Sequence, residues 1–153
     1  LRNNNVEVVT MDMNPELHPD LIGDIRNINF KENFFDIVAG FEILEHLPYE
    51  DFLSVLKNMK KITSKYIFIS VPNHEKTLLR VSTKIPFIKE KNIQIRVPSF
   101  SNKVFWQEHY WEIGMRGYSL KKIKNTIGDS GLKIIKDYVP IDCPWTHYFL
   151  MEK

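Results

Sequence analysis

Apolar residues at the start of the chain gather in short runs that end in acids. Residues 6–11 are mostly β-branched or apolar, and the run breaks at Asp12, shortly before a proline that cannot donate to a strand ladder. Residues 21–25 form a shorter apolar run that carries Asp24. Residues 34–41 are almost continuously apolar, which is typical of a central parallel strand covered on both faces. The pattern therefore predicts strands over 6–11 and 34–41 and a short strand or loop over 21–25.

A helix and a further strand follow. Glu50 and Asp51 come directly after Pro48, where the first turn of a helix favours acids. Apolar residues then recur at helical spacing, at Phe52, Leu56, Met59 and Ile62. This spacing predicts an amphipathic helix of about 14 residues. Residues 66–71 are again apolar and predict a buried strand, so that strand, helix and strand form a βαβ unit.

The second half of the chain begins without this periodicity. Residues 74–117 contain prolines and several aromatic residues, and we interpret them as an insert on the substrate side. Ser119 can then cap a helix, and Gly131 stands where the end of that helix favours a left-handed residue. Residues 132–139 and 146–151 predict two final strands, and their short connection predicts an antiparallel pair.

Composition and charge exclude several classes of protein. The 153 residues are 43% hydrophobic and 26% charged, which predicts one globular domain over residues 1–153. The formal net charge of +2 is too small to predict a nucleic-acid partner. No apolar run is long enough for a membrane span, and the first residues lack the apolar core of a signal peptide, so we expect a cytoplasmic protein. Cys143 is the single cysteine, and we predict neither a disulfide nor a metal site.

Two motifs within this order of elements point to a known family. They are Phe35-Asp36-Ile37-Val38 and Leu44-Glu45-His46-Leu47. With the acid-terminated strands before them, they resemble class I S-adenosylmethionine-dependent methyltransferases of the ubiquinone-biosynthesis-like type (methyltransferase type 11/23), over nearly the whole chain. The resemblance implies a Rossmann-like α/β sheet, mostly parallel, with an antiparallel C-terminal strand. The family's first strand and glycine-rich loop should precede Val6, where only five residues stand and none is glycine, so we expect a sheet without its first strand.

The resemblance also implies residues that bind the cofactor, S-adenosylmethionine. An acid at the carboxyl end of a strand in such a sheet faces the ligand crevice. Asp12 would accept hydrogen bonds from the ribose hydroxyls, and Met13 would pack on the adenine. Asp24 and Ile25 would recognise the adenine through a carboxylate and a backbone amide. The alternatives are that Asp12 only ends a strand in solvent and that Asp24 only forms a turn.

Two further candidates for cofactor binding and two for catalysis lie further along the chain. Phe41 and Glu42 end the central strand and would lie near the methionine part of the cofactor, although Phe41 could equally pack in the core. His109 could act as a general base near neutral pH, and His46 matches a histidine of the family. Against these roles, His46 could only bond a loop, and His109 could be a packed or surface imidazole.

Two residues are candidates for substrate binding, and several functions compete. Tyr110 and Trp111 either line an apolar substrate pocket or fill the core. The leading hypothesis is methyl transfer to an oxygen, nitrogen or carbon atom of a small molecule. The alternatives are a non-catalytic binding or scaffold module with this fold, completed as a homo-oligomer, or a fragment of a longer enzyme. A Rossmann-type dehydrogenase ranks lower because it also requires a glycine-rich turn.

Overall fold

The centre of the fold is a sheet of four strands in the order β3-β4-β8-β7. The computed structural model describes residues 6–83, 91–99, 101–102 and 108–153. The strands of this sheet are β3 (Phe35–Phe41), β4 (Thr63–Pro72), β7 (Lys133–Tyr138) and β8 (Thr146–Glu152). β3 and β4 are parallel, whereas β8 is antiparallel to both β4 and β7. The predicted α/β fold, with a mostly parallel sheet and a reversed C-terminal strand, is confirmed.

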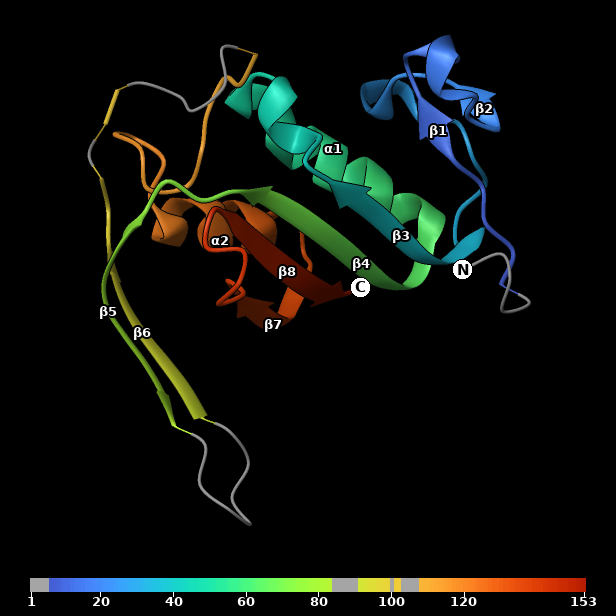
Figure 1. The fold of residues 1–153 in the computed structure, drawn as a ribbon. Coiled ribbons are helices and arrows are strands. Elements are labelled where there is room, and N and C mark those ends of the chain that lie inside the picture. Colours follow the sequence, from blue (N-terminus) through green and yellow to red (C-terminus); the bar gives the residue numbers. More distant parts are fainter. Residues whose placement is uncertain (1–5, 84–90, 100, 103–107) are drawn as a thin grey trace.

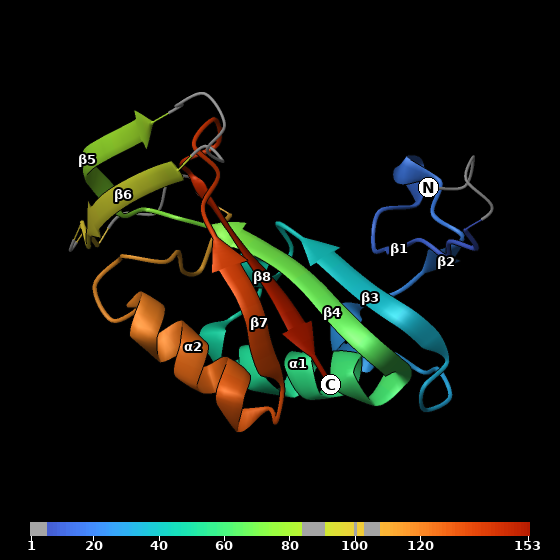
Figure 2. The same ribbon diagram turned by 90° about the horizontal axis from the view of Figure 1, so that it is seen from below.

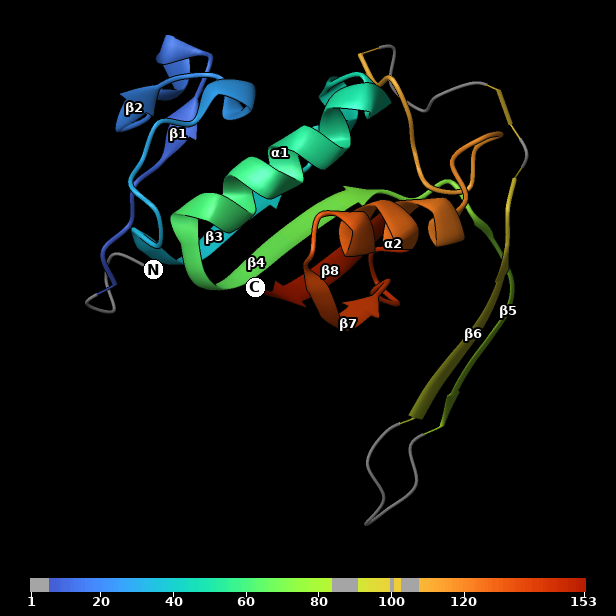
Figure 3. The ribbon, with the colours of Figure 1, turned by 180° about the vertical axis from the view of Figure 1, so that it is seen from behind.

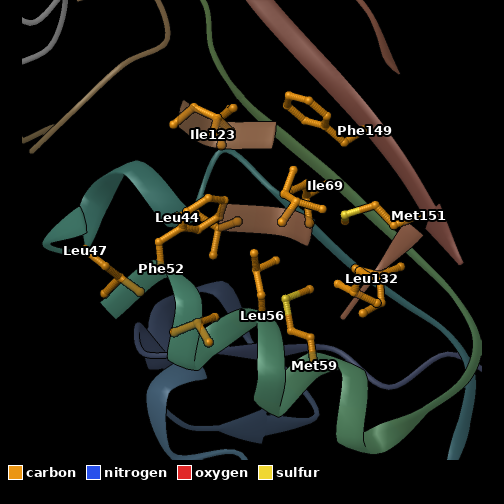
Figure 4. Close-up of a cluster of buried hydrophobic side chains, with 14 of the residues drawn as sticks. Leu44, Leu47, Phe52, Leu56, Met59, Ile69, Ile123, Leu132, Phe149 and Met151 are labelled. Carbon is orange, nitrogen blue, oxygen red and sulfur yellow. The ribbon is translucent and has the colours of Figure 1, made fainter. Parts of the chain in front are cut away.

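Helices α1 (Tyr49–Ile62) and α2 (Leu120–Asp129) cover the same face of this sheet (Figures 1 and 2). The buried side of α1 consists of Phe52, Val55, Leu56, Met59 and Ile62. Figure 4 shows Leu56 and Met59 directed toward Ile69 of β4 and Met151 of β8. Burial of each such side chain contributes about 1.5–3 kcal/mol, so this layer is the main apolar core.

Both ends of α2 follow the sequence signals. The N–H of Lys122 donates to Ser119 Oγ at 3.2 Å and caps the first turn. After the last turn, Gly131 has a φ of 78°, in the left-handed region that glycine adopts without strain. Its carbonyl accepts a hydrogen bond from Lys60 Nζ at 2.7 Å, which joins the end of α2 to α1.

The opposite face of the sheet carries an aromatic row, and no described helix covers it. Phe41, Phe68, Tyr148 and Tyr138 form this row, with successive ring centroids 5.1, 5.8 and 5.4 Å apart. Among the described residues β3 is an edge strand, and Ile37 is 58% exposed. The prediction of a central strand covered on both faces was therefore wrong for residues 34–41. The outer edge of β3 has no neighbouring strand among the described residues, and no described helix covers the second face of the sheet, so apolar residues of β3 stay in contact with solvent.

The N-terminal strands form a separate unit beyond β3 (Figure 2). β1 (Met11–Asp12) and β2 (Leu21–Ile22) are parallel and pair only with each other in the described residues. The strand predicted over 6–11 was thus too long, and the short strand or loop predicted over 21–25 contains a strand of two residues. A strand continues only as far as its residues pair with residues of a neighbouring strand. β1 and β2 pair over two residues each, so both strands are two residues long.

Strands β5 (Lys76–Thr83) and β6 (Lys91–Val97) form an antiparallel hairpin that extends away from the sheet (Figures 1 and 3). The hairpin lies in the insert over 74–117, where the periodicity of the preceding elements is lost. Residues 84–90, 100 and 103–107 of this insert lie outside the described residues. Neither helix of the described chain combines the length and apolarity needed to cross a bilayer.

We predict that Leu56→Ala lowers the free energy of unfolding by about 2–5 kcal/mol, because Leu56 is fully buried and alanine leaves a cavity. Leu78→Ala is the matched control, since Leu78 is 67% exposed, and its change should stay within about 0.5 kcal/mol. Urea unfolding followed by circular dichroism measures both. Equal losses in the two variants would contradict the packing described above.

A buried histidine links β7 and β8. His147 Nε2–H donates to Asp137 Oδ2 at 3.0 Å, and the ring stacks on Phe149 at 4.5 Å. His147 Nδ1 is buried and has no hydrogen-bond partner in the described residues. Protonation would place an unmatched N–H there. Burial accordingly lowers the pKa of His147 to about 4, against the hydrogen bond to Asp137.

We therefore expect stability to depend on pH through His147. The pKa of the imidazole is 6.5 in the unfolded chain and about 4 in the folded chain. The neutral ring therefore contributes its full amount to the free energy of unfolding above pH 6.5. As the pH falls from 6.5 to 4, roughly 3 kcal/mol is lost. Urea titrations over this range should show a shallower slope for His147→Leu than for the parent chain. Identical slopes would exclude His147 as the titrating group.

Candidate functional site

A cavity of about 590 Å³ lies between the β1–β2 unit and β3. Six residues singled out in the sequence line it: Asp12, Met13, Asp24, Ile25, Glu42 and His46. They come from the ends of β1, β2 and β3 and from the segments that follow those strands. The other four candidates, Phe41, His109, Tyr110 and Trp111, lie outside this lining. The structure thus brings the acids of three strand ends together around one space.

Asp12 is the last residue of β1 and is followed by a tight turn. Its Oδ1 accepts a hydrogen bond from the N–H of Asn14 at 2.8 Å. No donor among the described residues contacts Oδ2, so this oxygen can accept a hydrogen bond from a ligand. Met13 beside it is 63% exposed, which leaves its side chain available for contact with a flat apolar group.

Asp24 is held by its neighbour Arg26. The carboxylate accepts from the Arg26 backbone N–H at 2.8 Å and from Arg26 Nη2 at 2.5 Å. The hydrogen bonds from Arg26 lower the pKa of Asp24, so it stays ionised. Asp24 also caps the short 3-10 turn η3 (Ile25–Asn27). It therefore fills the turn-forming role that was one of the two alternatives, while still lining the cavity.

Glu42 adopts an unusual backbone conformation at the end of β3. Its φ is 52°, in the left-handed region. Its N–H donates to Ser70 Oγ at 3.1 Å, and Ser70 Oγ donates to Glu42 Oε1 at 2.8 Å. Partial burial raises the pKa of Glu42, against the hydrogen bond from Ser70. The reciprocal bonds to β4 fix this carboxyl group at the cavity wall.

The loop after β3 contains a fully buried carboxyl group. Glu45 lies in the 3-10 turn η4 (Leu44–His46), and burial raises its pKa to about 8. Two hydrogen bonds join this loop to the segment before α2. The N–H of Tyr110 donates to the Glu45 carbonyl at 2.8 Å, and Trp111 Nε1 donates to the Leu47 carbonyl at 3.2 Å.

His109 lies behind the cavity, between two buried acids. Its Nδ1 is 2.9 Å from Glu112 Oε1, and its Nε2 is 4.0 Å from Glu45 Oε1. Because a carboxylate only accepts, Glu112 selects the form of His109 with a proton on Nδ1. His74 Nδ1 lies 3.0 Å from the other oxygen of Glu112. The His109 ring meets His46 edge to face, with centroids 4.8 Å apart.

Sequence reasoning missed part of this cluster. Glu45 stood in the quoted family motif without a role, and Glu112 and His74 were not singled out. A signal for Glu112 existed, since it follows His109 by three residues. Trp111 is fully buried, which places it in the core, the second of its two alternatives, while Tyr110 is 59% exposed. Glu45, His46 and His109 place one ligand atom each within 4.8 Å of one another, a grouping suited to a metal ion.

The fold is that of S-adenosylmethionine-dependent methyltransferases. A structure of such an enzyme from Archaeoglobus fulgidus matches with a TM-score of 0.65 at 12% identity, covering 99% of this chain and 78% of that chain. One from Clostridium acetobutylicum matches with a TM-score of 0.54 at 12% identity, covering 93% of this chain and 73% of that chain. The sequence itself matches no family model and no curated protein.

A third solved structure carries bound small molecules. It is the Burkholderia thailandensis 1,6-didemethyltoxoflavin-N1-methyltransferase with bound 1,6-didemethyltoxoflavin and S-adenosylhomocysteine. It matches with a TM-score of 0.56 at 11% identity, covering 94% of this chain and 59% of that chain. At these identities the likeness establishes the Rossmann-like fold alone.

We predict energetic coupling between His109 and Glu112, because both side chains are almost completely buried and their contact is short. A double-mutant cycle with His109→Ala and Glu112→Ala should give a coupling energy of about 1–3 kcal/mol in chemical unfolding. The control pair is Lys65 and Asp36, 3.0 Å apart but 62% and 72% exposed, for which we expect less than about 1 kcal/mol. Equal coupling in both cycles would contradict the described geometry.

Proposed function

We propose that the chain is a methyltransferase domain that transfers a methyl group from S-adenosylmethionine to a small molecule. The main support for this proposal is the cavity, which is lined by Asp12, Asp24 and Glu42 at three successive strand ends. The fold around it is shared with S-adenosylmethionine-dependent enzymes. In an open α/β sheet, ligands bind outside the carboxyl ends of the strands. The volume of about 590 Å³ lies in the range of small-molecule sites.

The residues of the cavity fit the cofactor in chemical kind. Asp12 would accept from the ribose hydroxyls through its available Oδ2, and Met13 would cover the adenine. Ile25 and the Arg26-bound Asp24 would lie at the adenine edge. Glu42 would lie toward the methionine part, where a carboxyl group attracts its ammonium group. Phe41, which was expected beside it, belongs to the aromatic row outside the cavity lining.

When bound, S-adenosylmethionine supplies an electrophilic methyl group, whose bond to sulfur breaks as the bond to the acceptor forms. The chain's own part is to orient the acceptor and to remove its proton. His46 is exposed and lines the cavity, so it can accept that proton directly. His109 lies behind it, and Tyr110 is exposed for contact with the substrate. Residues 1–153 would act as one domain, with the insert at 74–117 on the substrate side.

A non-catalytic module with this fold is the second candidate. The outer edge of β3 has no neighbouring strand among the described residues, which leaves its backbone groups able to pair with a strand of another chain. A partner that pairs with this edge, such as a second copy of the chain, would then be its ligand. Cofactor binding separates the two candidates.

We expect calorimetry to detect binding of S-adenosylmethionine and S-adenosylhomocysteine, and Asp12→Ala to weaken it by about 1.5–3 kcal/mol, or at least about tenfold, because a charged hydrogen-bond acceptor is lost. The matched control is Asp36→Ala, an exposed acid of β3 that pairs with Lys65 outside the cavity. This control should bind like the parent chain. Absence of binding to the parent chain at millimolar cofactor would favour the non-catalytic module.

A further inference from the structure

Three side chains of the site converge in a way that methyl transfer does not require. Glu45 and His46 come from the loop after β3, and His109 comes from the segment before α2. Each offers one ligand atom, and these atoms lie within 4.8 Å of one another. We propose that Glu45, His46 and His109 form a binding site for a divalent transition-metal ion of the Zn²⁺ class.

The donor set determines the class of ion. Two imidazole nitrogens and one carboxylate oxygen suit Zn²⁺ and its neighbours, whereas Mg²⁺ and Ca²⁺ favour oxygen ligands alone. Ligand atoms around Zn²⁺ lie about 2.1 Å from the ion, so the three atoms must move closer together than 4.8 Å. His46 is exposed and can make this movement by side-chain rotation.

Glu45 supplies an independent indication of a ligand. Its side chain is fully buried, yet neither carboxyl oxygen has a hydrogen-bond partner in the described residues. His109 Nε2 lies 4.0 Å from Oε1, beyond hydrogen-bond distance. A buried carboxyl group without partners is unfavourable, and native proteins rarely leave one. A cation between Glu45 and the two imidazoles would remove this penalty.

Glu112 orients one of the ligands. Metal-bound histidines usually donate their second ring N–H to a carboxylate or a carbonyl, which fixes the ring. His109 has this arrangement, with Nδ1 at 2.9 Å from Glu112 Oε1 and Nε2 facing Glu45. Because Glu112 is itself fully buried, the orientation of His109 is set before any ion arrives.

The position of His46 gives the ion access and a function. His46 lines the cavity, so a coordination position not taken by protein would face that space. An ion there would acidify a bound hydroxyl group directly and take the place of a histidine base. The site itself is independent of methyl transfer, and it can be tested without the cofactor.

The test uses Zn²⁺ alone on the full chain after removal of bound metal with a chelator. We expect one Zn²⁺ per chain by atomic absorption after dialysis, with affinity measured by competition against a chromophoric chelator. His46→Ala, His109→Ala and Glu45→Gln should each weaken binding by more than about tenfold, and Glu112→Gln by about 10- to 100-fold. His18→Ala, an exposed histidine that is not part of the cluster, should bind like the parent chain.

The proposal is overturned if the parent chain binds no Zn²⁺, or if His46→Ala binds as tightly as the parent. His46 carries the decisive variant because it is exposed, whereas changes at buried Glu45 or His109 can also unfold the chain. Circular dichroism of each metal-free variant identifies any that unfold. Loss of S-adenosylmethionine binding with retained Zn²⁺ binding would refute the proposed function and leave the metal site standing.

Discussion

Two hydrogen bonds between distant segments hold the candidate site together. The carbonyls of Glu45 and Leu47 accept from the Tyr110 N–H and from Trp111 Nε1. Trp111 is fully buried among the side chains of α1, so these bonds are anchored in the main core. Because Tyr110 and Trp111 directly follow His109, these two hydrogen bonds also hold His109 close to Glu45. If the loop after β3 separated from this segment, the cluster of histidines and acids would not exist.

The two walls of the cavity are supported differently. β3 and its loop rest on the core, whereas the β1–β2 unit has a ladder of only two residue pairs. Contacts with α1 add to this support: Asn58 Nδ2 donates to the Arg26 carbonyl at 3.0 Å, and Arg26 Nη1 lies 3.8 Å from Asp51 Oδ2. Asp24, bound to Arg26, is thereby tied to the helix. The spacing between the acids of the two walls therefore also depends on α1.

Local signals predicted the elements that local physics decides. The apolar spacing of α1, the cap at Ser119 and the left-handed Gly131 all appear as expected. Strand partners could not be derived in this way, because the position of β3 at an edge and the length of β1 depend on residues far away in the chain. The strand-end acids Asp12 and Asp24 followed from topology, since carboxyl ends of parallel strands share one edge. Glu112 did not, because only the folded chain brings it against His74.

The backbone of Glu42 has a consequence for how the chain would respond to selection. A side chain at a φ of 52° costs roughly 1–2 kcal/mol relative to glycine, which adopts this conformation freely. Glycine at this position would relax the turn but remove the carboxyl group that Ser70 holds at the cavity. Stability and chemistry therefore compete at a single residue. A library screened only for thermal resistance should accumulate glycine there, whereas one screened for ligand binding should retain the acid.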